Sequence, residues 1–240
     1  MYSNLYRNTH YDENIWNTGI NFALLDKLSM IDKHEYIVAN TMTGKILHCT
    51  SSTYIFSRFS HKEIMERGID YFIGLMHEKD ADEINYAIRA IEELTNSIGN
   101  GAKDLVYHST VKIRFGKQYR PFLIKAFALT DELALIALKP APHNTTDHQL
   151  CWNPNTKTLY RYSAEAHRFR EEARAPLNEK QMEILLLLGT GMGKEEVADT
   201  LCITTNTLNY HLKAIKAKLK ASSMAESINL IASYNFLFKD

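Results

Sequence analysis

The residues best suited to bind a partner molecule lie near the C-terminus of the 240-residue chain. Between residues 205 and 221 there are four lysines, at 213, 216, 218 and 220, and no acidic residue. At about 100° per residue, one side of a helix here would carry Asn206, Asn209, Tyr210, Lys213 and Lys220. Lysines neutralise the phosphates of a nucleic acid, and an asparagine can pair with adenine in the major groove. The segment therefore predicts contacts with duplex DNA.

The neighbouring residues predict a helical setting for this segment. Residues 194–201 and 205–219 both have helical periodicity, and only residues 202–204 separate them. Two helices joined by so short a turn are typical of a helix-turn-helix. Thr204 is a natural N-cap for the second of these helices. Its apolar side, which must face a core, is formed by Leu208, Leu212, Ile215 and Leu219.

A simpler explanation of the lysines competes with DNA binding. Any small helical domain has one apolar side and one solvated side, and lysines are common on the latter. Lys+Arg and Asp+Glu balance at 28 each over the whole chain, so a basic surface must be local. The tight turn, the N-cap and the absence of acids together favour DNA. The acids of the preceding helix, Glu195, Glu196 and Asp199, must then point away from phosphate.

A set of spaced residues extends the pattern beyond the two helices: Leu177, Asn178, Glu183–Leu185, Gly191, Glu196–Ala198, Leu201, Ile203, Thr204, Thr207, Leu208, His211, Lys218, Leu219 and Ala225. With these residues, the segment 177–237 resembles a LuxR-type helix-turn-helix domain. The resemblance implies a four-helix, all-α domain over 176–240 whose third helix enters the major groove of double-stranded DNA. The family's usual contact positions fall on Asn209, Tyr210 and Lys213. The full set of predicted DNA-binding residues is Thr205, Asn206, Asn209, Tyr210, Lys213, Lys216 and Lys220. Asn209 stands where the family usually has a basic residue, which would remove one phosphate contact.

The first half of the chain has the character of an α+β fold. Strands are predicted at 35–39, 45–50, 105–115, 119–129 and 132–139, with turn residues between them. A helix is predicted over 18–31, short helical pieces over 53–76, and a longer helix over 80–97 that ends at Gly99. This order predicts a five-stranded antiparallel sheet with helices between its second and third strands.

That order, with His77–Asp80 just before the longer helix, resembles a PAS domain over residues 33–139. Combined with the aromatic segment around Trp152 and Tyr160, the chain resembles PAS–LuxR-type regulators of the Bacteroides type. A sensor of this kind needs a cavity, for which we expect the lining residues Phe72, Phe115, Phe122 and Phe127. A PAS fold does not define its ligand, so a small molecule or a protein could provide the signal.

These patterns divide the chain into four parts. They are an N-terminal arm and helix (1–32), the PAS-like sensor (33–139), a connector (140–175) and the helix-turn-helix domain (176–240). The connector starts at a Pro-Ala-Pro sequence. Residues 159–163 and 168–170 within it flank a polar turn and predict a small hairpin.

Several other classes of protein are excluded. The chain has no Gly-x-Ser-x-Gly, no phosphate-binding glycine-rich loop and no His-Glu-x-x-His, so we expect no enzyme and no cofactor. His143, Asp147, His148 and Cys151 are close in sequence, but their spacing fits no standard zinc site, so no metal is predicted. No segment approaches the roughly 20 apolar residues of a membrane span, and the three separated cysteines favour a reducing, cytoplasmic setting.

The sequence therefore predicts a cytoplasmic, one-component transcription regulator that binds specific DNA sites. We expect a homodimer that places two recognition helices about one turn of DNA apart. Residues 224–236 are the candidate dimer helix, with Ile228, Ile231 and Ala232 in excess of what three partner helices need. The alternative is a protein-interaction module whose PAS-like domain binds a protein partner and whose DNA binding is weak or vestigial. Ligand, operator and direction of regulation stay open.

Overall fold

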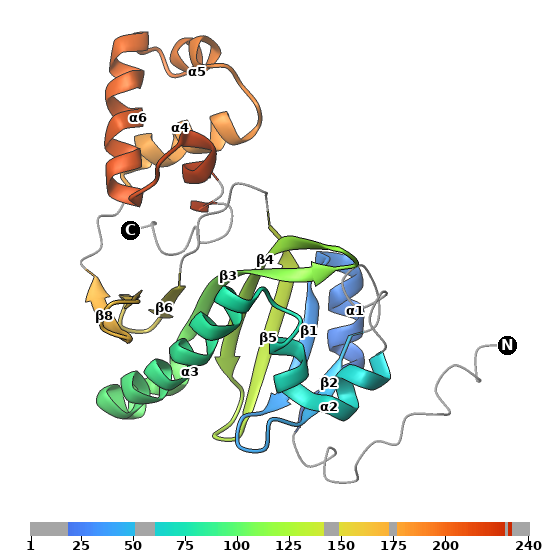
Figure 1. The fold of residues 1–240 in the computed structure, drawn as a ribbon. Helices are drawn as coiled ribbons and strands as arrows, with labels where there is room; N and C mark the ends of the chain where they lie inside the picture. The colour runs from blue at the N-terminus through green and yellow to red at the C-terminus, as the bar shows by residue number, and fades with distance from the viewer. Residues whose placement is uncertain (1–18, 51–60, 142–148, 173–176, 229, 232–240) are drawn as a thin grey trace, which may run out of the picture.

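One antiparallel sheet organises the N-terminal part of the chain (Figure 1). The computed structural model describes residues 19–50, 61–141, 149–172, 177–228, 230 and 231. Within these ranges, eight strands follow the order β2-β1-β5-β4-β3-β6-β7-β8. The strands are β1 (Glu35–Asn40), β2 (Ile46–Cys49), β3 (Val106–Phe115), β4 (Gln118–Ala128), β5 (Leu133–Pro140), β6 (Gln149–Asn153), β7 (Thr158–Ser163) and β8 (Arg168–Glu172).

The sheet is larger than the five strands predicted, and that prediction is corrected here. Strands β1 to β5 lie where the sequence placed them, but β6, β7 and β8 come from the predicted connector. β6 pairs with β3, where Trp152 lies opposite Val106, and so covers a strand edge that would otherwise be unpaired. The hairpin expected in the connector corresponds to β7 and β8, in which Tyr162 lies opposite Phe169.

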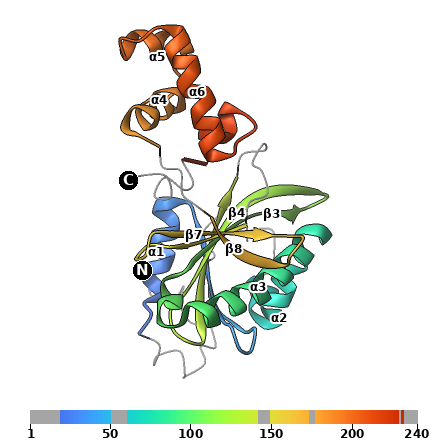
Figure 2. The same ribbon diagram turned by 90° about the vertical axis from the view of Figure 1, so that its left-hand side faces the viewer.

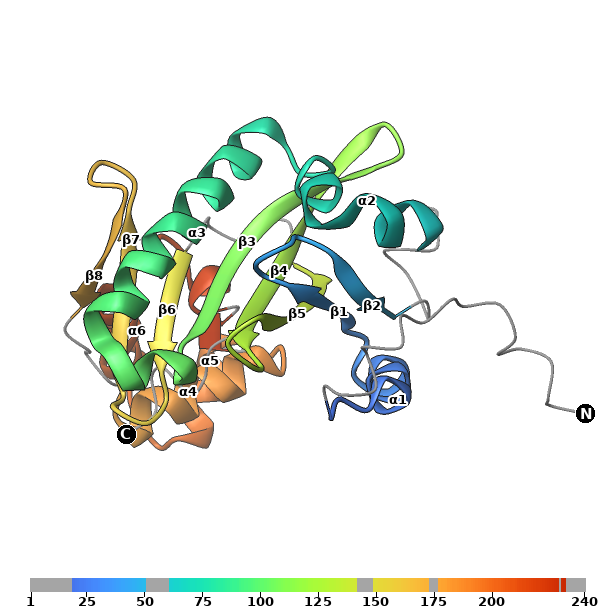
Figure 3. The same ribbon diagram turned by 90° about the horizontal axis from the view of Figure 1, so that it is seen from below.

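Two helices cover one face of the sheet, as Figure 3 shows. They are α2 (His61–Ile73) and α3 (Glu78–Ile98), which is followed by the 3-10 turn η3 (Gly99–Asp104). Ala87 and Ala90 of α3 pack into one buried cluster with alternate residues of β3, such as Val111 and Ile113. α2 is kinked at Gly68, which has φ +73°, and a Cβ there would lie 2.5 Å from the Gly44 carbonyl oxygen. Glycine is therefore required where α2 approaches the turn between β1 and β2.

The other face of the sheet carries α1 (Phe22–Asp32), the helix expected over 18–31. Leu25 is its buried apolar contact, packed with Val38 and Leu135 of the sheet. Leu24, Leu28 and Ile31 share the helical spacing but are 51%, 37% and 77% exposed. The helix therefore meets the sheet along a narrower side than its apolar residues suggest.

The C-terminal part is helical and lies beyond one end of the sheet (Figure 2). Its labelled helices are α4 (Glu179–Gly189), α5 (Lys194–Thr200) and α6 (Thr205–Leu219). Asn178 and Gln181 form a capping box that starts α4, with hydrogen bonds of 2.9 and 3.2 Å. Residues 224–228, 230 and 231 are also helical, and the rest of the predicted fourth helix lies outside the described residues. No helix in the described part of the chain is long and apolar enough to span a membrane.

A shared apolar cluster joins the two parts. Leu123, Leu150, Trp152 and Leu159, from the face of the sheet opposite α3, belong to the same buried cluster as the C-terminal helices. On the helical side this cluster includes Leu177, Ile184, Leu185, Leu208, Leu212, Ile215, Leu219, Leu230 and Ile231. The core of the C-terminal part therefore continues onto the sheet.

Candidate DNA-binding site

The turn between α5 and α6 sets the start of the candidate recognition helix. Cys202 adopts a left-handed conformation with φ 52°, which ends α5 and reverses the chain. The Ile203 N–H then donates to the Ala198 carbonyl at 2.9 Å. The Thr204 hydroxyl accepts a 3.1 Å hydrogen bond from the backbone N–H of Thr207, as an N-cap does. The predicted helix-turn-helix and its cap are both present.

The two sides of α6 separate as the sequence predicts. Leu208, Leu212, Ile215 and Leu219 are all buried in the core of the helical part. On the other side, Tyr210 is 72% exposed, which leaves its ring free to contact a partner. A single exposed side chain is common on protein surfaces, so Tyr210 matters here through its neighbours on α6.

A hollow of about 560 Å³ runs beside the exposed side of α6. It collects most of the predicted DNA-binding side chains and contains three lysines but no acid. Its lining residues are Lys194, Asn206, Asn209, Tyr210, Leu212, Lys213, Lys216 and Met224. Such a concave, positively charged surface with amide groups is chemically suited to a phosphate backbone and to base edges.

Lys194 is the member of this hollow that the sequence prediction missed. It is the first residue of α5 and is followed directly by two glutamates, which hid it in a segment of mixed charge. Glu196 does not face the hollow, because its Oε2 accepts a 2.7 Å hydrogen bond from the Gly193 N–H at the start of its own helix. None of the three acids of α5, Glu195, Glu196 and Asp199, lines the hollow, so its charged lining residues are all lysines.

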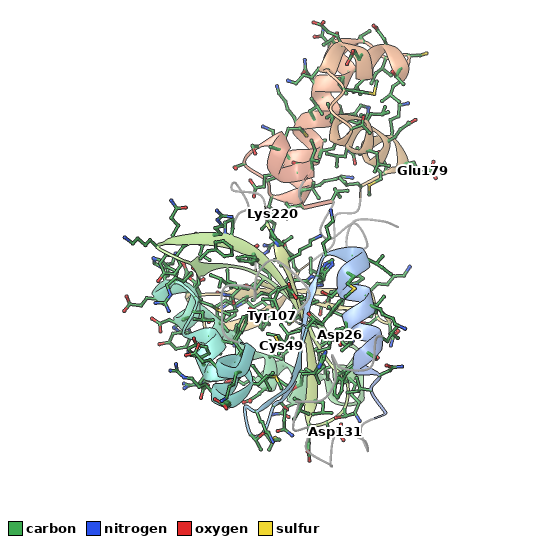
Figure 4. The ribbon with its side chains drawn as sticks, turned by 90° about the vertical axis from the view of Figure 1, so that its right-hand side faces the viewer. Asp26, Cys49, Tyr107, Asp131, Glu179 and Lys220 are labelled. Carbon is green, nitrogen blue, oxygen red and sulfur yellow. The ribbon has the colours of Figure 1, made fainter. Side chains whose placement is uncertain are left out.

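Two of the lysines near the end of α6 are engaged elsewhere. Lys218 donates a 3.0 Å hydrogen bond to Gln181 Oε1 at the start of α4. Lys220, a predicted DNA contact, forms an ion pair with Glu172 of β8 and does not line the hollow. Figure 4 shows Lys220 at the end of the helical part that is nearest to the sheet. Thr205 is exposed at the first position of α6 and also lies outside the lining.

The four phenylalanines predicted to line a sensor cavity do not come together. Phe72 and Phe122 are 2% and 1% exposed within the core under α2 and α3. Phe115 is buried near the β3–β4 turn, where the Arg120 guanidinium lies 4.6 Å from its ring centroid. Phe127 pairs with Val106 and Leu135, on the opposite face of the sheet from Phe122, and is 37% exposed. This part of the prediction is corrected, because residues an odd number apart on a strand face opposite ways.

A second hollow, of about 460 Å³, lies between α2 and β3. Its lining is polar as well as apolar and includes none of the four phenylalanines. The lining residues are Arg67, Asp70, Tyr71, Gly74, Leu75 and Arg114. The Arg67 guanidinium is stacked 4.0 Å from the Tyr71 ring centroid.

The cysteine and histidine residues give no metal site in the described part of the chain. Within those residues no three His, Cys, Asp or Glu side chains are grouped so as to hold an ion. Cys151 is buried in β6, and burial raises the pKa of its thiol. His143, Asp147 and His148 lie outside the described residues.

These features define a helix-turn-helix DNA-binding domain. Residues 175–231 match the family of bacterial regulatory proteins named luxR, and they form a helix-turn-helix domain of that family. The match covers residues 175–231 and is with regulatory proteins, as predicted for this segment. No curated protein matches the chain.

Solved structures with some likeness to the chain include those of VqmA. A VqmA dimer of Vibrio cholerae in the absence of target DNA is 11% identical, over 88% of either chain, with a TM-score of 0.33. A Vibrio cholerae VqmA–ligand–DNA complex is 11% identical over 90% of this chain and 89% of that one, with the same TM-score of 0.33. A phage VqmA–DPO complex is 10% identical over 90% and 92%, with a TM-score of 0.26. The TM-scores are too low for these structures to inform the function of this chain.

Proposed function

We propose that the protein is a one-component transcription regulator that reads specific DNA sites through the hollow beside α6. The observation that carries this proposal is the composition of the hollow, in which three lysines and two asparagines meet without an acid. Asn206, Asn209 and Tyr210 lie in the N-terminal half of α6, the part of a recognition helix that reaches base edges. Lys194, Lys213 and Lys216 flank them and would hold phosphates on either side of the groove.

We infer that residues 33–139 act as a PAS-like sensor of a signal. The support is the succession of strands β1 to β5, with α2 and α3 inserted between β2 and β3. The three further strands come after this unit and lead to the helical part. We leave the signal, a small molecule or a protein, undefined. As a regulator of bacterial genes the protein would act in the cytoplasm, where the chromosome lies.

We also propose a homodimer, since two recognition helices on a near-palindromic site multiply the affinity of one. The helix predicted to form the dimer, residues 224–236, has less apolar surface to offer than expected. Ile231 is only 5% exposed, because it packs in the core of its own chain. Ile228 is partly buried in the same cluster, and Ala232 lies outside the described residues. The helix that would form the dimer is therefore not assigned.

The proposal is tested by binding of genomic DNA fragments to the full chain over a series of salt concentrations. Lys213→Ala should weaken every site by a similar factor and lower the slope of log K against log salt by about 1. Asn209→Ala should relax the base preference at one position, where a good bidentate contact discriminates by about 1–3 kcal/mol. Lys117 is an exposed lysine in the β3–β4 turn, and Lys117→Ala is the matched control. It should change neither the affinity and its salt slope nor the base preference.

Failure to retain any duplex fragment at low salt would reject the DNA-binding proposal. The alternative of a protein-interaction module would then lead. One observation favours it, namely the exposed apolar side chains of α1, Leu24, Leu28 and Ile31. Capture of a partner that Leu28→Lys abolishes would be its direct test.

A further inference from the structure

The last three strands of the sheet have a different environment on each face. Because side chains alternate along a strand, Tyr160, Tyr162 and Phe169 face the cluster under α3. Leu150, Trp152 and Leu159 face the other way and belong to the cluster of the DNA-binding domain. The strands β6, β7 and β8 therefore form a wall between the sensor core and the DNA-binding domain.

Glu172 lies at the end of this wall and contacts both the wall and the DNA-binding domain. Its Oε2 accepts a 2.5 Å hydrogen bond from Arg161 Nε on the neighbouring strand β7. Its Oε1 forms an ion pair with the ammonium of Lys220, the residue that follows α6. The Glu172 side chain is 15% exposed and that of Lys220 is 62% exposed, so the carboxylate is shielded from solvent while the ammonium stays accessible. Burial pushes the pKa of Glu172 upwards, but hydrogen bonds from Lys220 and Arg161 outweigh it and hold the pKa below its ordinary value.

We propose that Glu172 is a latch that holds the C-terminal end of the recognition helix against the sensor sheet, and that DNA competes with Glu172 for Lys220. In the latched form Lys220 is neutralised by a carboxylate of its own chain and cannot serve a phosphate. In the DNA-bound form its ammonium pairs with the phosphate backbone, and Glu172 keeps Arg161 alone. This inference rests on the proposed function, because it describes how DNA binding by the hollow is regulated.

Strand β8 also connects the sensor core to the ion pair between Glu172 and Lys220. Three residues before Glu172, Phe169 lies in the sensor cluster and is 8% exposed. Its ring meets Tyr107 of β3 edge-on, with centroids 6.3 Å apart, and Tyr162 of β7 at 5.4 Å. A signal that repacks this aromatic group would shift β8 and, with it, the carboxylate that holds Lys220.

The test compares Glu172→Gln with Glu171→Gln in the full chain. The two substitutions remove one charge each from adjacent residues of β8, and Glu171 is exposed on the opposite face of the strand. Affinity for a retained genomic fragment is the first readout. The second is the distance between the domains without DNA, by fluorescence transfer between a dye on exposed Cys202 and one on Lys117→Cys in the β3–β4 turn.

We expect Glu172→Gln to tighten DNA binding about three- to tenfold, within the range of ordinary coupling between sites, and to lengthen or broaden the interdomain distance. Glu171→Gln should change neither. Lys220→Gln should also remove the ion pair and change the interdomain distance, yet it should weaken DNA binding, because it removes the phosphate contact that Glu172 had masked. Opposite effects of Glu172→Gln and Lys220→Gln on affinity are the signature of the competition.

The proposal is overturned if Glu172→Gln behaves like Glu171→Gln in both readouts, or if the distance changes while DNA affinity does not. A different result concerns the proposed function itself. If no form of the chain binds duplex DNA at low salt, the regulator proposal fails. The distance measurement then decides whether Glu172 holds the two parts together, since an unchanged distance in Glu172→Gln rejects the latch as well.

Discussion

Asp80 in the first turn of α3 accepts a 2.5 Å hydrogen bond from the backbone N–H of Lys112 in the middle of β3. The carboxylate belongs to a residue that is only 4% exposed. Beside it, the His77 N–H donates to the Lys112 carbonyl at 2.7 Å. The start of α3 is thus fixed to β3 by two hydrogen bonds, one from the backbone N–H of Lys112 and one to its backbone carbonyl.

Removal of this carboxylate should destabilise the sheet part of the protein. Asp80→Ala leaves the Lys112 N–H without its acceptor, and hydrogen bonds to charged groups contribute about 1.5–3 kcal/mol. Asp80→Asn keeps an oxygen in place and should cost less. Urea unfolding measures the effect, with Asp82→Ala at an exposed position of the same helix expected to stay within about 0.5 kcal/mol. Equal losses for Asp80→Ala and Asp82→Ala would show that only the helix dipole matters.

The cap of the recognition helix gives a second expectation. Thr204→Ala removes the acceptor of the Thr207 N–H and should destabilise the helical domain by about 1 kcal/mol. Fraying of the first turn of α6 should also reduce discrimination between base sequences, because the base-reading residues start there. Thr204→Ser retains the hydroxyl and is the control for both thermal unfolding and DNA selectivity. A Thr204→Ala protein with unchanged selectivity would place base recognition further along α6.

Local signals explain what the sequence could predict. The bounds of α6 follow from Thr204 at its start and from the spacing of Leu208, Leu212 and Ile215, all within one segment. The strands β1 to β5 are marked by β-prone residues and by the turn residues between them. The hairpin β7–β8 was predicted, but its place in the sheet was not, because it joins the sheet through β6, which pairs with β3 about 40 residues upstream.

Non-local relationships explain what could not be predicted about the candidate site. Lys220 has the right residue type and spacing for a DNA contact, but its partner Glu172 comes from another element and could not be identified from either sequence segment. Lys194 was overlooked because its two acidic neighbours suggested a solvated helix, and the structure shows that Glu196 serves as a cap. Phe127 could have been left out of the predicted cavity from the sequence alone. It is five residues from Phe122, and an odd separation indicates opposite faces of β4.

A buried histidine should make the stability of the protein depend on pH. His108 is 0% exposed in β3, and burial, with a smaller contribution from the charge of Lys125, lowers its pKa to about 3. In the unfolded chain the pKa of histidine is about 6.5. Below that pH the unfolded chain binds a proton that the folded chain does not, so the free energy of unfolding falls as pH drops from 6.5 towards 3. For one group the slope approaches about 1.4 kcal/mol per pH unit.

Chemical unfolding at pH 7, 6, 5 and 4 would measure this dependence. The variant His108→Gln cannot take up the proton, so its stability should fall less steeply than that of the wild-type chain between pH 6 and pH 4. Above pH 7 the two slopes should coincide, because His108 is then neutral in both states. Parallel curves over the whole range would mean that His108 is accessible to protons in the folded protein.

Lys194 offers the sharpest check on the extent of the DNA-binding surface, because it belongs to α5 and the other basic residues of the hollow belong to α6. A phosphate contact at Lys194 would carry no base specificity. Lys194→Ala should therefore weaken binding by a similar factor at every site and lower the salt slope by about 1. Lys180→Ala is the matched control, since Lys180 is outside the hollow and lies 3.3 Å from Glu183 on α4. If Lys194→Ala and Lys180→Ala have the same affinity and salt slope, Lys194 does not contact DNA. The DNA-binding surface is then confined to α6.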